Sequence, residues 1–255
     1  MGVAINVGGD ERGKNPPMDP PFLSLGGLLV QSHQWGLKYP ELALRRKDAV
    51  AAGSRYDWSG NGRHLASLGA ATMNNYGFIA STDPSAPTTA DSVNVLAPGG
   101  ELTVVAFVRS FSTSKPVNVV RSQDASPYAI QLSLFGATPR LEARQADGAP
   151  AVVSFSAAAM NGFCMMVGAW SATKRGVWFK SPAGALVGVE ETSAAAFGST
   201  APLEFGIEAS GSSNDGENTF TAAAIYDAYL TPAQLAEIQA AYQLFVSRIA
   251  APFTA

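Results

Sequence analysis

The stretch FTAAAIYDAYLTPAQLAEIQAAY, residues 220–242, contains a predicted strand that runs almost directly into a predicted helix. Small residues at 222–224 precede Ile225 and Tyr226. This pattern suits a strand that is covered on both faces, where bulkier side chains would collide. Asp227 then ends the strand. The stretch therefore predicts a buried strand joined to a helix with almost no loop between them.

Thr231 is the predicted N-cap of this helix, because its hydroxyl can accept a hydrogen bond from a backbone N–H of the first turn. Pro232 suits the first helical position, and Gln234 completes a T-x-x-Q capping box. Two leucines stand at the positions of a hydrophobic staple, and apolar residues then recur at spacings of three and four. The staple residues are Leu230 and Leu235, and the stripe is Leu235, Ile238, Tyr242 and Phe245. The helix is expected to pack on a core, and nothing in it indicates catalysis.

Residues 102–209 form a series of short β-patterned runs separated by glycine-containing turns. The runs are LTVVAFVRS (102–110), YAIQLSLF (128–135), AVVSFS (151–156), CMMVGAW (164–170), GVWFK (176–180) and LEFGIEA (203–209). Trp170 and Trp178 lie in such runs and are expected in the core. A further short strand is expected near residues 28–31. Many short strands followed by one helix predict an all-β antiparallel sandwich.

Two motifs carry a resemblance to a known family. The closing stretch AAIYDAYLTPAQLAEI, residues 223–238, and the turn DWSGNGRH, residues 57–64, resemble the end and the opening of a laminin-G-like domain of the concanavalin A-like lectin/glucanase superfamily. The resemblance covers roughly residues 50–247. It implies a jelly-roll β-sandwich with a C-terminal α-helix, and a central hairpin in which residues 164–170 pair with residues 176–180.

The chain is expected to hold one main domain, residues 22–255, behind an extended N-terminal arm. Residues 1–21 are rich in glycine and proline and poor in large apolar side chains, which suits an arm that contacts other subunits. Of all residues, 47% are hydrophobic and 15% are charged, which is typical of a folded globular protein. The net charge of −3 argues against nucleic-acid binding. No apolar stretch reaches the length of a membrane span.

The sequence favours a binding or structural role over an enzymatic one. The superfamily's glucanases carry three alternating acids on one strand, and no such strand occurs here. Glu190 and Glu191 are adjacent and would point to opposite faces of a strand. His33 and His64 are isolated, and neither has metal-binding spacing. The single cysteine, Cys164, lies in an apolar run and is expected to be buried.

The turn at residues 57–64 is the candidate glycan site. A sugar site needs an aromatic face and nearby polar groups. Trp58 supplies the ring, and the polar groups are Asp57, Asn61, Arg63 and His64. The alternative is that Trp58 only covers an edge of the sandwich.

A Ca²⁺ site is the candidate metal site, and no other cofactor is expected. Laminin-G-like domains can hold Ca²⁺ at a rim through carboxylate, amide and backbone oxygens. The candidate oxygen ligands are Asp57, Asn61, Asn214 and Asp215. The alternative is that these residues only shape their turns, because Asp and Asn bond their own backbone there.

A lectin-like domain with no disulfide, no visible secretory signal and a Gly/Pro-rich arm suits a protein of a bacteriophage virion. Such proteins fold and assemble in the host cytoplasm. The sequence analysis therefore predicts a non-enzymatic structural protein of a tailed phage, in the tail, fibre or capsid decoration. The expected partners are other virion proteins, further copies of the chain and host cell-surface polysaccharide. The alternative is a secreted carbohydrate-binding or carbohydrate-active protein.

Overall fold

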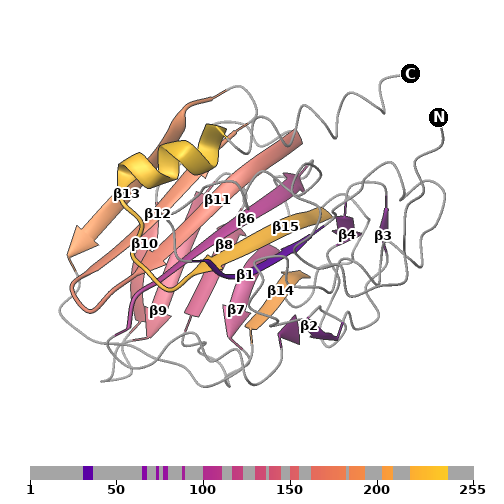
Figure 1. The fold of residues 1–255 in the computed structure, drawn as a ribbon, viewed down its shortest axis with the longest axis horizontal. Helices are drawn as coiled ribbons and strands as arrows, with labels where there is room; N and C mark the ends of the chain where they lie inside the picture. Colours follow the sequence, from indigo (N-terminus) through magenta and orange to yellow (C-terminus); the bar gives the residue numbers. More distant parts are fainter. Residues whose placement is uncertain are drawn as a thin grey trace, which may run out of the picture.

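The computed structural model describes two antiparallel β-sheets and one helix (Figure 1). The described residues are 31–36, 65–67, 73–74, 77–79, 88–89, 100–110, 117–122, 130–135, 138–144, 150–154, 162–181, 184–192, 203–208 and 219–240. The arm at 1–21, the turn at 57–64, the loop at 210–218, and the stripe residues Tyr242 and Phe245 lie outside them.

The first sheet has eight strands, in the order β13-β12-β11-β6-β15-β4-β3, with β1 also paired to β15. Its strands are β1 (Gln31–Gly36), β3 (Met73–Asn74), β4 (Gly77–Ile79), β6 (Leu102–Ser110), β11 (Gly162–Trp170), β12 (Lys174–Lys180), β13 (Leu186–Thr192) and β15 (Thr219–Tyr226). Strand β1 runs antiparallel to β15 and shares only Gln31 with the strand expected near 28–31, whose other residues lie outside the described ones.

The second sheet has seven strands, in the order β10-β9-β8-β7-β14-β5-β2. Its strands are β2 (Leu65–Ser67), β5 (Thr88–Thr89), β7 (Val117–Ser122), β8 (Ile130–Phe135), β9 (Thr138–Arg144), β10 (Pro150–Ser154) and β14 (Leu203–Glu208). The chain makes a meander from β7 to β10 in this sheet, returns to the first sheet for β11 to β13, and then supplies β14 and β15 to opposite sheets. The predicted all-β class is confirmed.

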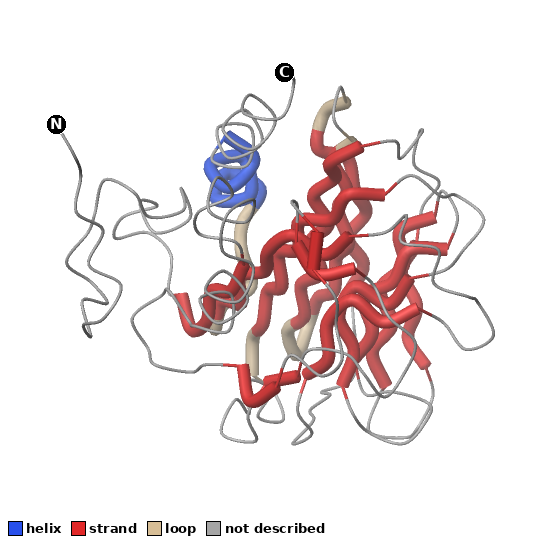
Figure 2. The backbone as a smooth tube through the Cα atoms, turned by 90° about the vertical axis from the view of Figure 1, so that its right-hand side faces the viewer, coloured by secondary structure: helices blue, strands red, loops and turns tan. Residues whose placement is uncertain are grey.

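The two sheets and the helix form layers, with the first sheet in the middle (Figure 2). Strands β9 and β10 of the second sheet lie against β12 of the first. In β6, every residue from Leu102 to Val108 is buried. Successive side chains of a strand point to opposite faces of the sheet, so both faces are covered here. The first sheet is therefore covered on both faces, which explains why its central strands read as continuous apolar runs.

The helix, residues 232–240, packs on the outer face of the first sheet. Strand register places Val105, Val167 and Ala224 side by side on that face. Leu235 and Ile238 of the helix belong to the same buried cluster and are fully buried. The apolar stripe predicted from sequence is confirmed for these two residues.

The start of the helix has the predicted capping box. The backbone N–H of Thr231 donates to Gln234 Oε1 at 2.9 Å, and the backbone N–H of Gln234 donates to Thr231 Oγ1 at 3.4 Å. Leu230 and Leu235 are both buried in the core cluster, as a hydrophobic staple requires.

Thr103 fixes the link between β15 and the helix. Its hydroxyl donates to the carbonyl oxygen of Ala228 at 2.7 Å and accepts from the backbone N–H of Leu230 at 3.1 Å. Because Thr103 lies on β6 beside Tyr226, the link is held at the point where the buried strand ends. The helix therefore leaves the sheet in one defined direction.

Candidate functional site

Trp178 lies flat across two neighbouring strands on the helix side of the first sheet. A Cβ added to Gly176 would be 2.2 Å from Trp178 Cη2, and one added to Gly188 would be 2.2 Å from Trp178 Cδ1. Gly188 is directly opposite Trp178 on β13. The indole therefore rests on backbone where any other residue would raise it away from the sheet.

Exposure separates the two tryptophans of these strands. Trp170 is fully buried, as predicted, but Trp178 is only partly buried and borders the core cluster. The expectation that Trp178 belongs to the core is thus corrected. Trp178 lies on β12, next to β13, and no strand lies beyond β13 in the described part of this sheet.

Tyr229 reaches this surface from the link between β15 and the helix. Its ring meets the indole of Trp178 edge to face, with ring centroids 6.3 Å apart and an interplanar angle of 72°. Its hydroxyl donates to Glu190 Oε2 at 2.9 Å, and its backbone N–H donates to Glu101 Oε2 at 3.2 Å. Tyr229 therefore joins the helix link to the edge of the sheet.

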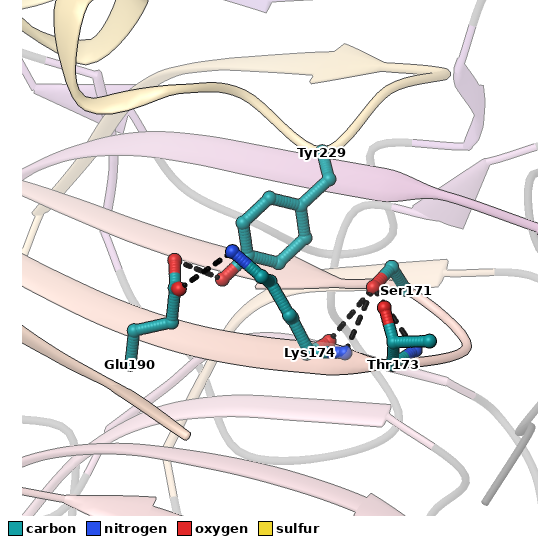
Figure 3. A network of polar contacts seen from close by, with 5 residues as sticks. All are labelled: Ser171, Thr173, Lys174, Glu190 and Tyr229. Atoms are coloured by element: carbon teal, nitrogen blue, oxygen red, sulfur yellow. Dashed lines mark hydrogen bonds and ion pairs between the residues drawn. The ribbon is translucent and has the colours of Figure 1, made fainter. Parts of the chain in front are cut away.

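Glu190 also accepts from Lys174, whose Nζ lies 3.0 Å from Glu190 Oε1 (Figure 3). Ser171 orders the turn before Lys174, because its Oγ accepts from the backbone N–H groups of Thr173 and Lys174 at 3.2 and 2.9 Å. Trp178, Tyr229, Glu190 and Lys174 form what is called here the Trp178 cluster.

Two groups of the Trp178 cluster, Glu190 and Tyr229, have shifted pKa values. The hydrogen bonds from Lys174 and Tyr229 lower the pKa of Glu190. Burial raises the pKa of Tyr229 above its usual value, and the hydrogen bond to Glu190 raises it further. At neutral pH Glu190 is thus a carboxylate and Tyr229 a neutral phenol, beside the indole of Trp178.

This arrangement has the groups that can bind a hydroxyl-rich ligand. An indole face can cover the apolar side of a sugar ring, while a carboxylate and an ammonium group can bind its hydroxyls. Glu191, the nearest other carboxylate in sequence, lies on the opposite face of β13 and contacts Arg175 at 3.2 Å. Glu190 and Glu191 therefore cannot flank one bond in the way that glycosidase carboxylates do.

Two buried side chains with titratable groups, Cys164 and Lys180, lie on strands β11 and β12. Cys164 is a free, buried thiol, as predicted, and burial raises its pKa to about 12 although the charge of Lys180 opposes the shift. Lys180 is 1% exposed, and its Nζ donates to the carbonyl oxygens of Ser181 and Gly184 at 3.0 and 2.6 Å. It thereby closes the turn between β12 and β13.

The residues proposed from sequence as binding sites lie outside the described residues. These are Trp58, Asp57, Asn61, Arg63 and His64 for the glycan, and Asp57, Asn61, Asn214 and Asp215 for Ca²⁺. In the part of the chain that the structure describes, no three His, Cys, Asp or Glu residues gather as metal ligands. The same part contains no helix long and apolar enough to cross a membrane.

The Trp178 cluster was missed by sequence reasoning, although one signal points to it. The spacing G-x-W at 176–178 places a glycine beside the tryptophan on the same strand face. A second glycine stands in the strand that follows the next turn. Aromatic side chains that cover glycines of an edge strand are a known way to stabilise sheets.

Comparison with solved structures shows similarity to bacterial toxin binding domains. The binding domain of botulinum neurotoxin serotype D has a TM-score of 0.62 and 8% identity, over 84% of this chain and 51% of that structure. The binding domain of Paraclostridial Mosquitocidal Protein 1 has a TM-score of 0.56 and 12% identity, over 86% of this chain and 52% of the other. The serotype G binding domain has a TM-score of 0.56 and 11% identity, over 83% and 50%.

The chain thus spans about half the length of these structures. At such identities the likeness shows the fold alone, an all-β fold shared with part of a toxin binding domain. No family model and no curated protein matches the sequence.

Proposed function

We propose that the chain is a non-enzymatic, carbohydrate-binding module with a concanavalin A-like, laminin-G-like jelly-roll fold. The alternation of the chain between two antiparallel sheets supports this fold, together with the two sequence motifs that resemble the family. The structural neighbours are binding domains, and that of serotype D has been solved in complex with N-acetylneuraminic acid. These neighbours favour binding over catalysis.

The observation that carries the proposal is the partly buried indole of Trp178, held flat on the sheet beside the paired groups of Glu190, Lys174 and Tyr229. A flat aromatic surface with polar groups at its rim is what a pyranose needs. Gly176 and Gly188 hold the ring against the sheet, and Tyr229 holds its edge. The site is thus formed before any ligand arrives, which reduces the entropy lost on binding.

The turn at residues 57–64, with Trp58, remains a second candidate for the same function, and Ca²⁺ at Asp57, Asn61, Asn214 and Asp215 remains a proposal. The two glycan sites are distinguishable by mutation, because Trp58 and Trp178 are far apart in sequence and belong to different motifs.

We place this module in the virion of a tailed bacteriophage, as a tail, fibre or capsid-decoration protein assembled in the host cytoplasm. The resemblance to laminin-G-like domains and the Gly/Pro-rich arm at 1–21 support this placement. Its partners would then be other virion proteins, further copies of the chain and host-surface polysaccharide. A secreted carbohydrate-binding or carbohydrate-active protein is the alternative. Mass spectrometry of purified particles tests the placement, and absence of the chain from them contradicts it.

Glycan binding is tested by array screening and calorimetric titration of the wild type, Glu190→Gln, Tyr229→Phe and Trp58→Ala. If the Trp178 cluster is the site, Glu190→Gln and Tyr229→Phe weaken binding at least tenfold while Trp58→Ala binds like the wild type. The matched control is Glu191→Gln, which changes the same residue type on the opposite face of β13. The opposite pattern, with loss only in Trp58→Ala, moves the site to the turn at 57–64. Failure of the wild type to bind any host polysaccharide contradicts the proposed function.

A further inference from the structure

Strand β13 ends the first sheet in the described part of the chain, and it is exposed on both of its faces. Val187 is 48% exposed, and it is the one exposed large apolar side chain among the described residues. Gly188 and Glu190, which face the other way, are exposed too. Because the strand order ends at β13, its outer backbone edge is unpaired among the described residues.

This edge lacks the usual protection against pairing with another strand. Edge strands are generally guarded by lysine, proline or inward-pointing charge. The segment GALVGV, residues 184–189, contains none of these. The charges that follow are compensated within the same protomer, because Glu190 pairs with Lys174 at 3.0 Å and Glu191 with Arg175 at 3.2 Å. The edge is therefore apolar at its centre and nearly neutral at its end.

We propose that β13 pairs antiparallel with β13 of a second copy of this chain, about a two-fold axis at Val187. Two identical surfaces related by a two-fold axis must be self-complementary, so the axis decides which residues meet. With the axis at Val187, each Val187 lies opposite its own copy. Leu186 then lies opposite Gly188, and Ala185 lies opposite Val189. Every pair in this central segment is apolar, and each Glu190 lies opposite the small Gly184.

Positions of the two-fold axis nearer the carboxylates bring unlike groups together. An axis at Gly188 places Leu186 opposite Glu190, and an axis at Val189 places Val187 opposite Glu191. An axis at Glu190 places the two Glu190 carboxylates directly opposite each other, which is destabilising. These three axes are thus disfavoured, whereas the axis at Val187 covers the most exposed large apolar side chain of the described residues with its own copy and separates the carboxylates.

The size of this contact predicts a dimer that dissociates on dilution. Stable interfaces bury about 800 Å² on each partner, and one short strand pair supplies less than that. We expect monomer and dimer to exchange in the micromolar range or above. In an assembly that brings copies close together, the same weak pairing is strengthened by the high effective concentration. This inference is independent of the glycan site.

Sedimentation velocity over a concentration series tests the dimer with the full chain. The wild type is expected to shift from monomer to dimer as concentration rises, and Val187→Lys is expected to stay monomeric. The control is Thr192→Lys, which places the same charge on an exposed position of β13 beyond the paired segment. Circular dichroism of both variants confirms that they remain folded. A wild type that is monomeric throughout the series overturns the proposal.

Cysteine cross-linking tests the register. In the proposed dimer the side chains of the two Val187 residues face each other across the axis, close enough for a disulfide to form with small adjustments. Val187→Cys is therefore expected to form a covalent dimer under mild oxidation, while Thr192→Cys stays reduced. The native Cys164 is buried and does not compete. Equal cross-linking of both variants overturns the register.

The N-terminal arm, residues 1–21, is an alternative partner for the edge of β13. If removal of residues 1–21 abolishes the dimer while Val187→Lys leaves it intact, the arm makes the contact and the proposed strand pairing is wrong.

Discussion

Trp178 lies over Gly188, its direct cross-strand neighbour, so closely that a Cβ on Gly188 would be 2.2 Å from Trp178 Cδ1. The two residues belong to one packing unit, in which the ring takes the space that a side chain on Gly188 would fill. From this contact we predict how the stability of the fold changes when Gly188 is substituted, with and without the indole of Trp178.

Gly188→Ala is expected to destabilise the fold by about 1–3 kcal/mol, the usual range for overpacking. In a Trp178→Ala background the same change should have little or no effect, because the ring that it displaces is gone. Chemical denaturation of the two single variants and the double variant measures this coupling. Additive effects would mean that the indole does not rest on Gly188.

Leu235→Ala is expected to lower the free energy of unfolding by about 2–5 kcal/mol, because the residue is fully buried against the first sheet. Leu235→Asp should cost more, since it places a charge in the same apolar site. Ala236→Ser, on the exposed side of the same helix, is the matched control and should stay within about 0.5 kcal/mol of the wild type. Wild-type melting of Leu235→Asp would show that the helix does not pack there.

Thr103→Val removes a hydroxyl that makes two hydrogen bonds to the link between β15 and the helix, one as a donor and one as an acceptor. The variant keeps the shape of the side chain but leaves the N–H of Leu230 and the carbonyl of Ala228 without this partner. We expect a loss of about 1–3 kcal/mol. Thr192→Val, at an exposed position, should be near neutral. Equal stability of the two variants in urea titrations would show that the Thr103 hydrogen bonds contribute nothing.

The contributions of Glu190 and Tyr229 to stability are expected to depend on pH in opposite directions, because their pKa values are shifted in opposite directions. The lowered pKa of Glu190 means that its contribution is present above its ordinary value of 4.5 and is lost as the pH falls through the lower folded-state value. The difference in melting temperature between the wild type and Glu190→Gln should therefore shrink in acid. A difference that stays constant down to pH 2 contradicts the Glu190 contacts.

The raised pKa of Tyr229 means that its contribution is present below its ordinary value of 10.0 and is lost as the pH rises further. Tyr229→Phe should accordingly be less sensitive than the wild type to pH values above about 10. Melting curves between pH 9 and 11 compare the two proteins. Parallel curves would show that the phenol is not held by Glu190.

Cys164 is expected to react very slowly with a thiol reagent in the native protein at pH 8 and rapidly after unfolding. Burial holds its pKa at about 12 against an ordinary value of 9.0, so little thiolate forms. The sign for stability follows from the raised pKa: the contribution is complete below 9.0 and is lost as the pH rises toward 12. Rapid native-state labelling would show that the thiol is accessible.

Local signals were sufficient to predict the helix start and about half of the described strands. The capping box of Thr231 and Gln234 depends on residues three apart, so it is readable without the fold. The run at 102–110 matches β6 because β-branched and apolar residues fill it. Strand β1 was misplaced because QSHQWG has no β-pattern of its own. Its backbone pairs with the edge of β15 instead.

The site was harder to predict because its contacts join distant parts of the chain. Tyr229 meets Glu190 only after the helix link is fixed on β6 by Thr103. Trp178 resembles a core residue in sequence because both faces of β12 carry apolar side chains. Its partial exposure follows from strand order, which places β12 next to the last strand of the sheet. The turn at 57–64 stays a prediction.

The buried side chain of Lys180 holds the turn between β12 and β13 through hydrogen bonds to two backbone carbonyl groups. Its ammonium group occupies the point where the carbonyl oxygens of Ser181 and Gly184 converge and donates a hydrogen bond to each. Because this group is covalently attached, we expect the β12–β13 turn to keep these two hydrogen bonds in the presence of a chelator.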